Sequence, residues 1–104
     1  MSYSVAFAPK ALTQLEALED YISKTEAPDV AARFVDNIIS YCDSLSVSPL
    51  RGKCRNDLLP ALRIIHYRHT TAIAFSGAAE TETVSILGVF YGGQDYAAQF
   101  QNHG

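Results

Sequence analysis

The sequence predicts a single α+β domain over residues 1–104, in which a helical hairpin packs on one face of a mainly antiparallel sheet. Three observations predict this class. Hydrophobic residues make up 48% of the 104, enough for a core. Apolar residues recur with a helical period over residues 9–45, and residues 62–91 read as strands. With a further strand over residues 3–7, the order is strand, helix, helix, strand, strand, strand.

The first half of the chain begins with a strand and continues into the two helices. Residues 3–7 alternate apolar with small or polar side chains, and Pro9 then suits the first turn of a helix. Helical spacing continues to about Lys24, and Pro28 and Asp29 mark the start of a second helix. The expected apolar stripes are Leu12, Leu15, Leu18 and Ile22 in the first helix and, on a wider face, Val30, Phe34, Ile38, Tyr41 and Leu45 in the second.

The second half of the chain reads as a loop followed by three strands. Residues 50–60 contain Gly, Asn and Pro and form the loop. Strands are expected over residues 62–67, 71–75 and 83–91, with a hairpin connection before the last. The last strand is the longest and most apolar, so we expect it at the centre of the sheet. Residues 95–100 predict a short helical turn.

Charge is unevenly distributed along the chain. The formal net charge is −3, which argues against a protein that coats nucleic acid by bulk electrostatics. Residues 16–43 hold seven acids against two bases, whereas residues 51–69 hold five bases against one acid. Solvated surface charge is one interpretation. The other is a basic edge that receives an acidic partner or a phosphate.

Two cysteines, Cys42 and Cys54, do not make a disulfide framework, and with the histidines they lack the paired short spacings of a zinc site. We therefore expect no metal and no cofactor, with Cys42 as a buried, inert thiol. Neither a signal sequence nor a membrane span is recognised, so a cytoplasmic protein without membrane contact is expected.

RNA cleavage is the enzymatic activity that the residue types allow. A metal-free ribonuclease needs a general base, a general acid and cations at the phosphate. Suitable side chains are Arg51, Lys53, Arg55, Arg63, His66, Arg68 and His69. Strand alternation, however, places Arg63 and His66 on opposite faces of their strand, so the two cannot act together there.

Four stretches of the chain together resemble the RelE/ParE superfamily of toxins from bacterial toxin–antitoxin modules, over about residues 3–96. The segment 3–22 is similar to the first strand and helix of the family. Leu45, Pro49 and Gly52 resemble its run after the second helix. Leu59–Arg63 is similar to the segment that enters the next strand, and Val84–Asp95 to the last strand and the polar cluster after it.

The resemblance implies one of two activities. RelE-like members are implied to cut mRNA in the ribosome with a lysine and arginine cluster and a C-terminal acid or base, whereas ParE-like members are implied to poison DNA gyrase. At the matching positions Arg63 is kept, Tyr91 stands where many relatives have histidine, and Gln94 where many have arginine. Because glutamine lacks the cation that would stabilise a phosphorane-like transition state, the pattern favours a ParE-like, non-catalytic gyrase inhibitor.

Two alternatives stay open. One is a RelE-like, metal-independent endoribonuclease that would use Arg55, Arg63 and Tyr91. The other is a non-toxic relative. For either active toxin the resemblance implies a cognate antitoxin with a DNA-binding N-terminal domain, bound to the toxin as a hetero-oligomer. We expect that partner to bind Arg51, Lys53, Arg55, Arg63, Arg68 and His69, and the remaining partner to be DNA gyrase or, in the alternative, the ribosome and mRNA.

Overall fold

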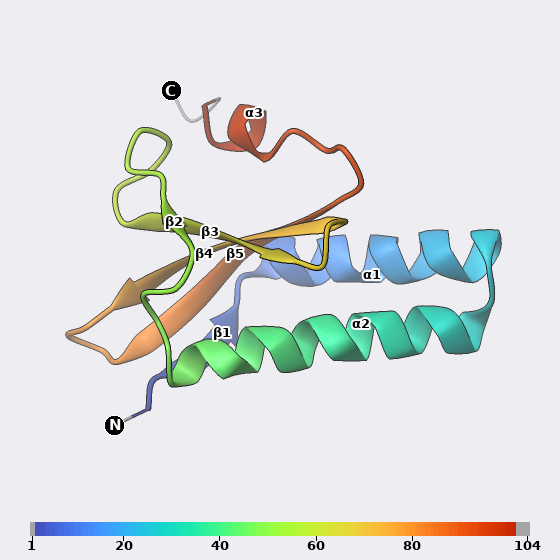
Figure 1. The fold of residues 1–104 in the computed structure, drawn as a ribbon, viewed down its shortest axis with the longest axis horizontal. Coiled ribbons are helices and arrows are strands. Elements are labelled where there is room, and N and C mark those ends of the chain that lie inside the picture. The colour runs from blue at the N-terminus through green and yellow to red at the C-terminus, as the bar shows by residue number, and fades with distance from the viewer. Residues whose placement is uncertain (1, 102–104) are drawn as a thin grey trace.

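The computed structural model describes residues 2–101, and it has the predicted α+β architecture (Figure 1). Along the chain the elements are β1 (Ser4–Phe7), α1 (Pro9–Thr25), α2 (Pro28–Asp43), the 3-10 turn η1 (Ser44–Ser46), β2 (Lys53–Cys54), β3 (Leu62–Tyr67), β4 (Thr71–Ala78), β5 (Thr83–Tyr91) and α3 (Tyr96–Gln101). The strands form one sheet in the order β1-β5-β4-β3-β2. The predicted strands, the helical hairpin and the terminal helical turn are therefore confirmed.

The sheet differs from the prediction in three details. Residues 53–54 form a short extra strand, β2, that pairs antiparallel with β3 inside the expected loop. β4 runs three residues further than expected, to Ala78. The middle strand of the sheet is β4 and not β5, because β5 pairs with β1 in parallel on its other side. Both β4 and β5 are interior strands, which explains why each reads as strongly apolar.

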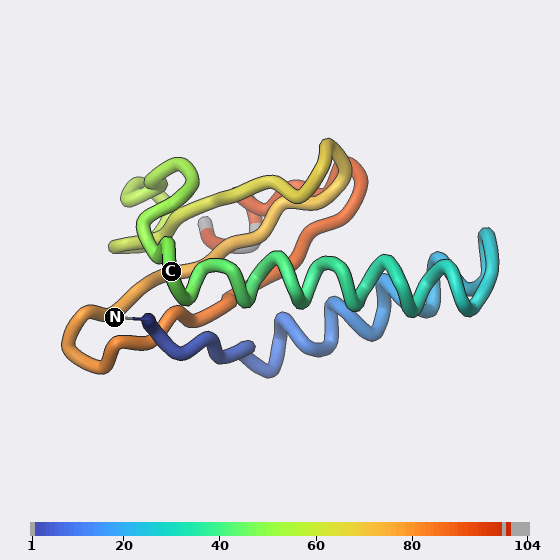
Figure 2. The backbone as a smooth tube through the Cα atoms, turned by 60° about the horizontal axis from the view of Figure 1, so that its bottom comes forward, coloured from blue at the N-terminus to red at the C-terminus, as the bar shows by residue number. Residues whose placement is uncertain are grey.

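The two long helices cover one face of the sheet, as predicted, and extend well past its end (Figure 2). Both start with proline in the first turn, where the missing N–H is no loss. The buried stripe of α1 contains Ala11, Leu15, Leu18 and Ile22. The expectation for Leu12 is wrong: this side chain is 48% exposed, and Ala11 takes the core position beside it. The wider apolar face of α2 is confirmed, since partly buried Phe34 and Tyr41 add to its fully buried residues.

The opposite face of the sheet carries a smaller core beneath α3. Leu62, Ile64 and Ala74 of the sheet pack there with Phe90, and Phe100 of α3 lies on them. Figure 1 shows α3 on the far side of the sheet from α1 and α2. The sheet is thus buried on both faces, more extensively on the side of the helical hairpin. No helix of the described residues is long and apolar enough to cross a membrane.

Candidate functional site

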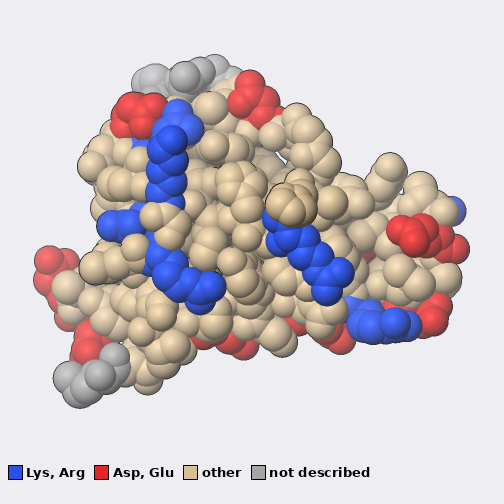
Figure 3. Space-filling model, viewed as in Figure 1, with Lys and Arg blue, Asp and Glu red and all other residues tan. Residues whose placement is uncertain are grey.

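The predicted basic residues gather around β2 and β3. We call Arg51, Lys53, Arg55, Arg63 and Arg68 the basic surface. Figure 3 shows Lys and Arg side chains on the side of the molecule that carries these strands, with Asp and Glu mostly around its rim. Lys53 and Arg68 are exposed, whereas the other three are partly buried. His69 is exposed in the β3–β4 turn beside Arg68.

Arg63 is tied to the loop that precedes β2. Its Nη1 donates to the carbonyl of Leu50 at 2.8 Å and lies 3.4 Å from the carbonyl of Gly52. Gly52 has φ +85°, and a Cβ at this position would lie 2.4 Å from the carbonyl oxygen of Ile64. Only glycine fits that close approach. Part of the Arg63 charge is therefore used to hold the loop against β3.

Two further arginines lie against aromatic rings. Arg51 donates to the hydroxyl of Ser44 at 2.9 Å, and its guanidinium lies 5.4 Å from the ring centre of Tyr41. Arg68, in the left-handed region at φ +55°, lies 5.2 Å from the ring centre of Tyr67. Cation–π contacts of this kind orient a guanidinium without neutralising it. Both arginines keep their positive charge near the surface.

Arg55 forms the one short ion pair of the basic surface among the described residues. It donates from Nε and Nη2 to the two carboxylate oxygens of Asp57 at 2.9 and 2.8 Å. The hydrogen bond from Arg55 holds the pKa of the Asp57 carboxyl below its usual range and raises that of the guanidinium. The Arg55 guanidinium also lies 5.9 Å from the ring centre of Tyr96 in α3. This arginine joins the loop to α3 and has its charge matched by a carboxylate.

A shallow pocket of about 270 Å³ lies beside this pair. Lys53, Arg55, His66 and Tyr96 line it with residues of β3 and Gly52. His66 thus faces the α3 side of the sheet, while Arg63 shares the helix side with Ile65 and Tyr67, which confirms that Arg63 and His66 lie on opposite faces.

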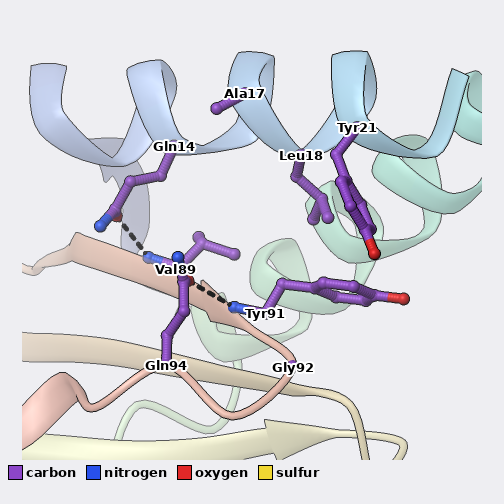
Figure 4. Close-up of a pocket in the computed structure, with 8 residues that line it drawn as sticks. All are labelled: Gln14, Ala17, Leu18, Tyr21, Val89, Tyr91, Gly92 and Gln94. Atoms are coloured by element: carbon purple, nitrogen blue, oxygen red, sulfur yellow. Dashed lines mark hydrogen bonds between the residues drawn. The ribbon is translucent and has the colours of Figure 1, made fainter. Parts of the chain in front are cut away.

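Tyr91 lies at the far end of β5, in an uncharged groove between α1 and β5. We call this the β5 groove. It has a volume of about 370 Å³ and is lined by Gln14, Ala17, Leu18, Tyr21, Val89, Tyr91, Gly92 and Gln94, none of which is charged (Figure 4). The Tyr91 ring centre lies 6.0 Å from that of Tyr21 and 5.8 Å from that of Phe34. The Gln94 side-chain oxygen accepts a hydrogen bond from the Tyr91 backbone N–H at 2.9 Å.

The three nuclease candidates do not form a cluster. Sheet register places Tyr91 level with Tyr67, through Thr71, and hence four residues along the sheet from Arg63. That offset alone is roughly 13 Å at about 3.3 Å per residue. Arg55 contacts Tyr96, on the α3 side of the sheet, whereas Arg63 lies on the helix side. A reacting phosphate could not contact all three side chains in this arrangement.

The two cysteines lie in different environments. Cys42 is fully buried in α2, and burial raises the pKa of its thiol to about 12. This confirms the expectation of a buried thiol that does not ionise at neutral pH. Cys54 is exposed in β2. Within residues 2–101, no group of three or more His, Cys, Asp or Glu side chains could hold a metal ion.

Two site residues were not predicted from the sequence. Gln14 lies 75 positions before Val89, yet its side-chain oxygen accepts a hydrogen bond from the Val89 backbone N–H at 2.7 Å. Tyr96 was assigned only to a helical turn, although it supports Arg55. No local pattern marks either contact, because both join segments that only the tertiary fold brings together.

Residues 5–96 match the family model described as the ParE toxin of the type II toxin–antitoxin system parDE. The chain therefore belongs to the ParE toxin family. A comparison with curated protein sequences finds no match.

Solved structures of toxins share the fold. The chromosomal ParDE system of P. aeruginosa superposes with a TM-score of 0.74 at 20% identity, covering 88% of this chain and 97% of that one. The RelBE2 toxin–antitoxin complex of Mycobacterium tuberculosis gives 0.68 at 25% identity, with coverage of 88% and 99%. A RelE toxin variant from E. coli in the free state gives 0.68 at 15% identity, with coverage of 97% and 95%. The RelE/ParE-like fold that the sequence predicted is confirmed.

Proposed function

We propose that this toxin acts by binding and inhibiting DNA gyrase and that it catalyses no reaction of its own. The observation that carries the proposal is the environment of Tyr91, which lies between aromatic rings in a groove lined by uncharged residues. A ribonuclease acting at this tyrosine would need a cation close to it to stabilise charge on the phosphate. Gln94 occupies the position where that cation would be expected, and its amide oxygen is turned towards the Tyr91 backbone.

The contacts that already engage two of the basic residues support the same proposal. Arg55 is paired with Asp57, and Arg63 donates to backbone carbonyls of the loop before β2. Guanidinium groups held in this way fix the conformation of the loop and can bind an acidic partner. Neither lies near Tyr91, so the three groups do not form the base, acid and cation that RNA cleavage requires.

A pair of assays tests the proposed target. Purified toxin is added to gyrase with relaxed plasmid, and supercoiling and the trapped cleavage complex are measured. The same preparation is added to a translating extract, and the integrity of the mRNA is followed. We expect loss of supercoiling and intact mRNA. Unchanged gyrase together with cut mRNA would replace the proposal with a ribosome-dependent endoribonuclease, and no effect in either assay would favour a non-toxic relative.

We further propose that a cognate antitoxin neutralises the toxin in the cytoplasm by covering the basic surface. The P. aeruginosa and M. tuberculosis relatives are described as toxin–antitoxin systems or complexes. An acidic, amphipathic segment would complement the charge of residues 51–69 and pack its apolar side on the adjoining sheet. Toxin and antitoxin would then form a hetero-oligomer. A DNA-binding N-terminal domain on the antitoxin would allow this complex to bind its own promoter.

Reversal of one charge tests this docking surface. Arg63→Glu should weaken binding of the cognate antitoxin by about tenfold or more, since a like charge would face its acidic segment. Arg33→Glu, on the exposed side of α2, is the matched control and should leave affinity within about twofold. Lys53→Glu repeats the test without touching the Arg63 contacts to the loop. Unchanged affinity in both Arg63→Glu and Lys53→Glu would place the antitoxin elsewhere.

A further inference from the structure

Within residues 2–101, no strand lies beside the last residues of β5 on the side away from β4. β1 pairs with β5 only between Ser4 and Phe7, opposite Thr83–Ile86. The chain then turns into α1 at Pro9, after a final backbone hydrogen bond that extends the β1–β5 pairing, from the Ala8 N–H to the carbonyl of Ile86 at 2.9 Å. β5 continues to Tyr91. Its final residues are therefore paired with β4 on one side and not with β1 on the other.

A bulge in β5 determines which backbone groups this edge presents. Ile86 pairs with Phe75 and Gly88 with Ala74, so Leu87 is the extra residue between them. A bulge shifts the alternation of the strand by one residue. Beyond it, the N–H groups of Val89 and Tyr91 point away from β4 and towards the vacant edge, where they act as two donors separated by one residue.

Side-chain amides take the place of a neighbouring strand at both donors. The Gln14 oxygen accepts from the Val89 N–H at 2.7 Å, and the Gln94 oxygen accepts from the Tyr91 N–H at 2.9 Å. Figure 4 shows Gln14 reaching down from α1 and Gln94 reaching up from the segment after β5, with the two hydrogen bonds on the same strand. A glutamine amide has the same acceptor as a peptide group, so these residues imitate the carbonyls of a paired strand.

The β5 groove provides the space that such a strand would occupy. Its volume of about 370 Å³ lies at the lower end of the range of ligand-binding pockets. Ala17 leaves room on the α1 side, and apart from the chain neighbours of Gly92 no atom of the described residues lies within 4 Å of its Cβ position at the open end. The lining is uncharged and offers tyrosine rings and amides. A charged segment would lose solvation there without gaining a partner.

We propose that this edge binds an extended, uncharged segment of a partner protein by strand addition. Carbonyls of the incoming segment replace the amides of Gln14 and Gln94 at the Val89 and Tyr91 N–H groups, and the released glutamines turn to the groove rim. The spacing of two donors on one strand edge is matched by alternate carbonyls of an extended peptide. This site is chemically distinct from the basic surface, and it stands whether the toxin acts on gyrase or on the ribosome.

Nuclear magnetic resonance with a defined peptide tests the proposal. The probe is an acetylated and amidated peptide with the sequence of residues 3–8, which is uncharged and forms the β1 partner of this strand. We expect saturable shifts of the Val89 and Tyr91 backbone amide signals and of the Gln14 and Gln94 side-chain amide signals. Shifts confined to Thr83–Ile86, exchange with β1, or no saturable shift would overturn the proposal.

Backbone methylation of the peptide distinguishes strand addition from apolar contact. Two probes carry N-methyl groups on alternate residues, one set odd and the other even. Because only one set of N–H groups faces β5, one methylated probe should lose binding at least about tenfold while the other binds like the parent. Equal binding of both methylated probes would show that main-chain pairing is not used. Concentration-dependent shifts of the same signals in toxin alone would assign the edge to a second copy.

A blocking variant in α1 provides the protein control. Ala17→Arg places a long, charged side chain in the groove at an exposed position where arginine suits a helix. It should abolish the saturable shifts. Leu12→Arg introduces the same side chain at an exposed position of α1 outside the groove and should leave these shifts unchanged. Equal peptide binding by the two variants would contradict the assigned site.

Discussion

The basic surface and the β5 groove lie towards opposite edges of one sheet and are built in opposite ways. The basic surface surrounds β2 and β3, where a loop with left-handed residues is held by guanidinium contacts to its own backbone. The β5 groove lies between α1 and β5, two regular elements, and its polar contacts are amide oxygens on backbone N–H groups. The basic surface therefore offers charged side chains on an irregular loop, whereas the β5 groove offers backbone N–H groups on a regular strand.

The difference means that the two regions would bind a protein partner by two kinds of interaction, charge at the basic surface and main-chain pairing in the β5 groove. Contacts with the basic surface would weaken as salt rises, because exposed charges are screened over about 8–10 Å at physiological ionic strength. Strand pairing in the groove depends on geometry and excluded water, so salt would affect it little. A partner that used both would be held by two chemistries that respond to different conditions.

The largest expected effect compares two glycines with positive φ, Gly52 at the basic surface and Gly92 at the β5 groove. Gly52→Ala should destabilise the fold by about 3 kcal/mol, since its Cβ would meet the Ile64 carbonyl as well as adopt a left-handed conformation. Gly92→Ala, at φ +70° with open space around it, should cost only about 1 kcal/mol. Urea denaturation of both variants measures the difference. Equal losses would mean that the loop before β2 shifts to relieve the contact.

The two cysteines report how accessible the basic surface is compared with the core. At pH 8, N-ethylmaleimide should label Cys54 in the native protein and leave Cys42 unmodified, because burial raises the pKa of the Cys42 thiol to about 12. Intact-mass measurement should therefore show one label on the native chain and two after unfolding. In Cys54→Ser the native chain should remain unlabelled. Rapid labelling of Cys42 in that variant would show that α2 opens readily.

Much of the fold could be predicted because each long element has its own hydrophobic period. The strand β2 could not, since two residues carry no periodicity and its pairing depends on the close approach of Gly52 to Ile64. The exposure of Leu12 could not be predicted from helical spacing. Ala11 and Leu12 fit the helical spacing about equally well, and only the packing of α1 on the sheet decides between them.

The candidate site was predictable in composition and not in arrangement. A count of charges along residues 51–69 located the basic surface. It gave no indication that Arg63 binds the Leu50 carbonyl or that Arg55 and Asp57 form a paired fork, because those contacts depend on the path of the loop. The groove was missed entirely, since Gln14 and Val89 come from opposite ends of the chain.

A smaller effect is expected at the ion pair within the basic surface. In Arg55→Gln the pKa of the Asp57 carboxyl should rise towards its usual range, since the hydrogen bond from Arg55 is what lowers it. A depressed native pKa stabilises the fold above the unfolded carboxyl value, and this contribution is lost as pH falls through the native value. Titration of the Asp57 carboxyl carbon by nuclear magnetic resonance measures the shift. An unchanged Asp57 pKa would mean that backbone hydrogen bonds, and not Arg55, lower it.

The smallest effect is expected on α2, where charge belongs to neither region. Arg33 and Asp29 lie one helical turn apart, with 3.7 Å between Nη2 of the arginine and Oδ2 of the aspartate. Both side chains are more than 70% exposed. An exposed pair of this kind contributes about 0.2–0.5 kcal/mol, because water screens it and both side chains lose freedom in forming it. Arg33→Ala should therefore change stability in urea by no more than about 0.5 kcal/mol. A loss of stability comparable to that of Gly52→Ala would mean that charge on the helical hairpin helps to hold the fold. The charged side chains of α2 would then differ less from those of the basic surface than the structure indicates.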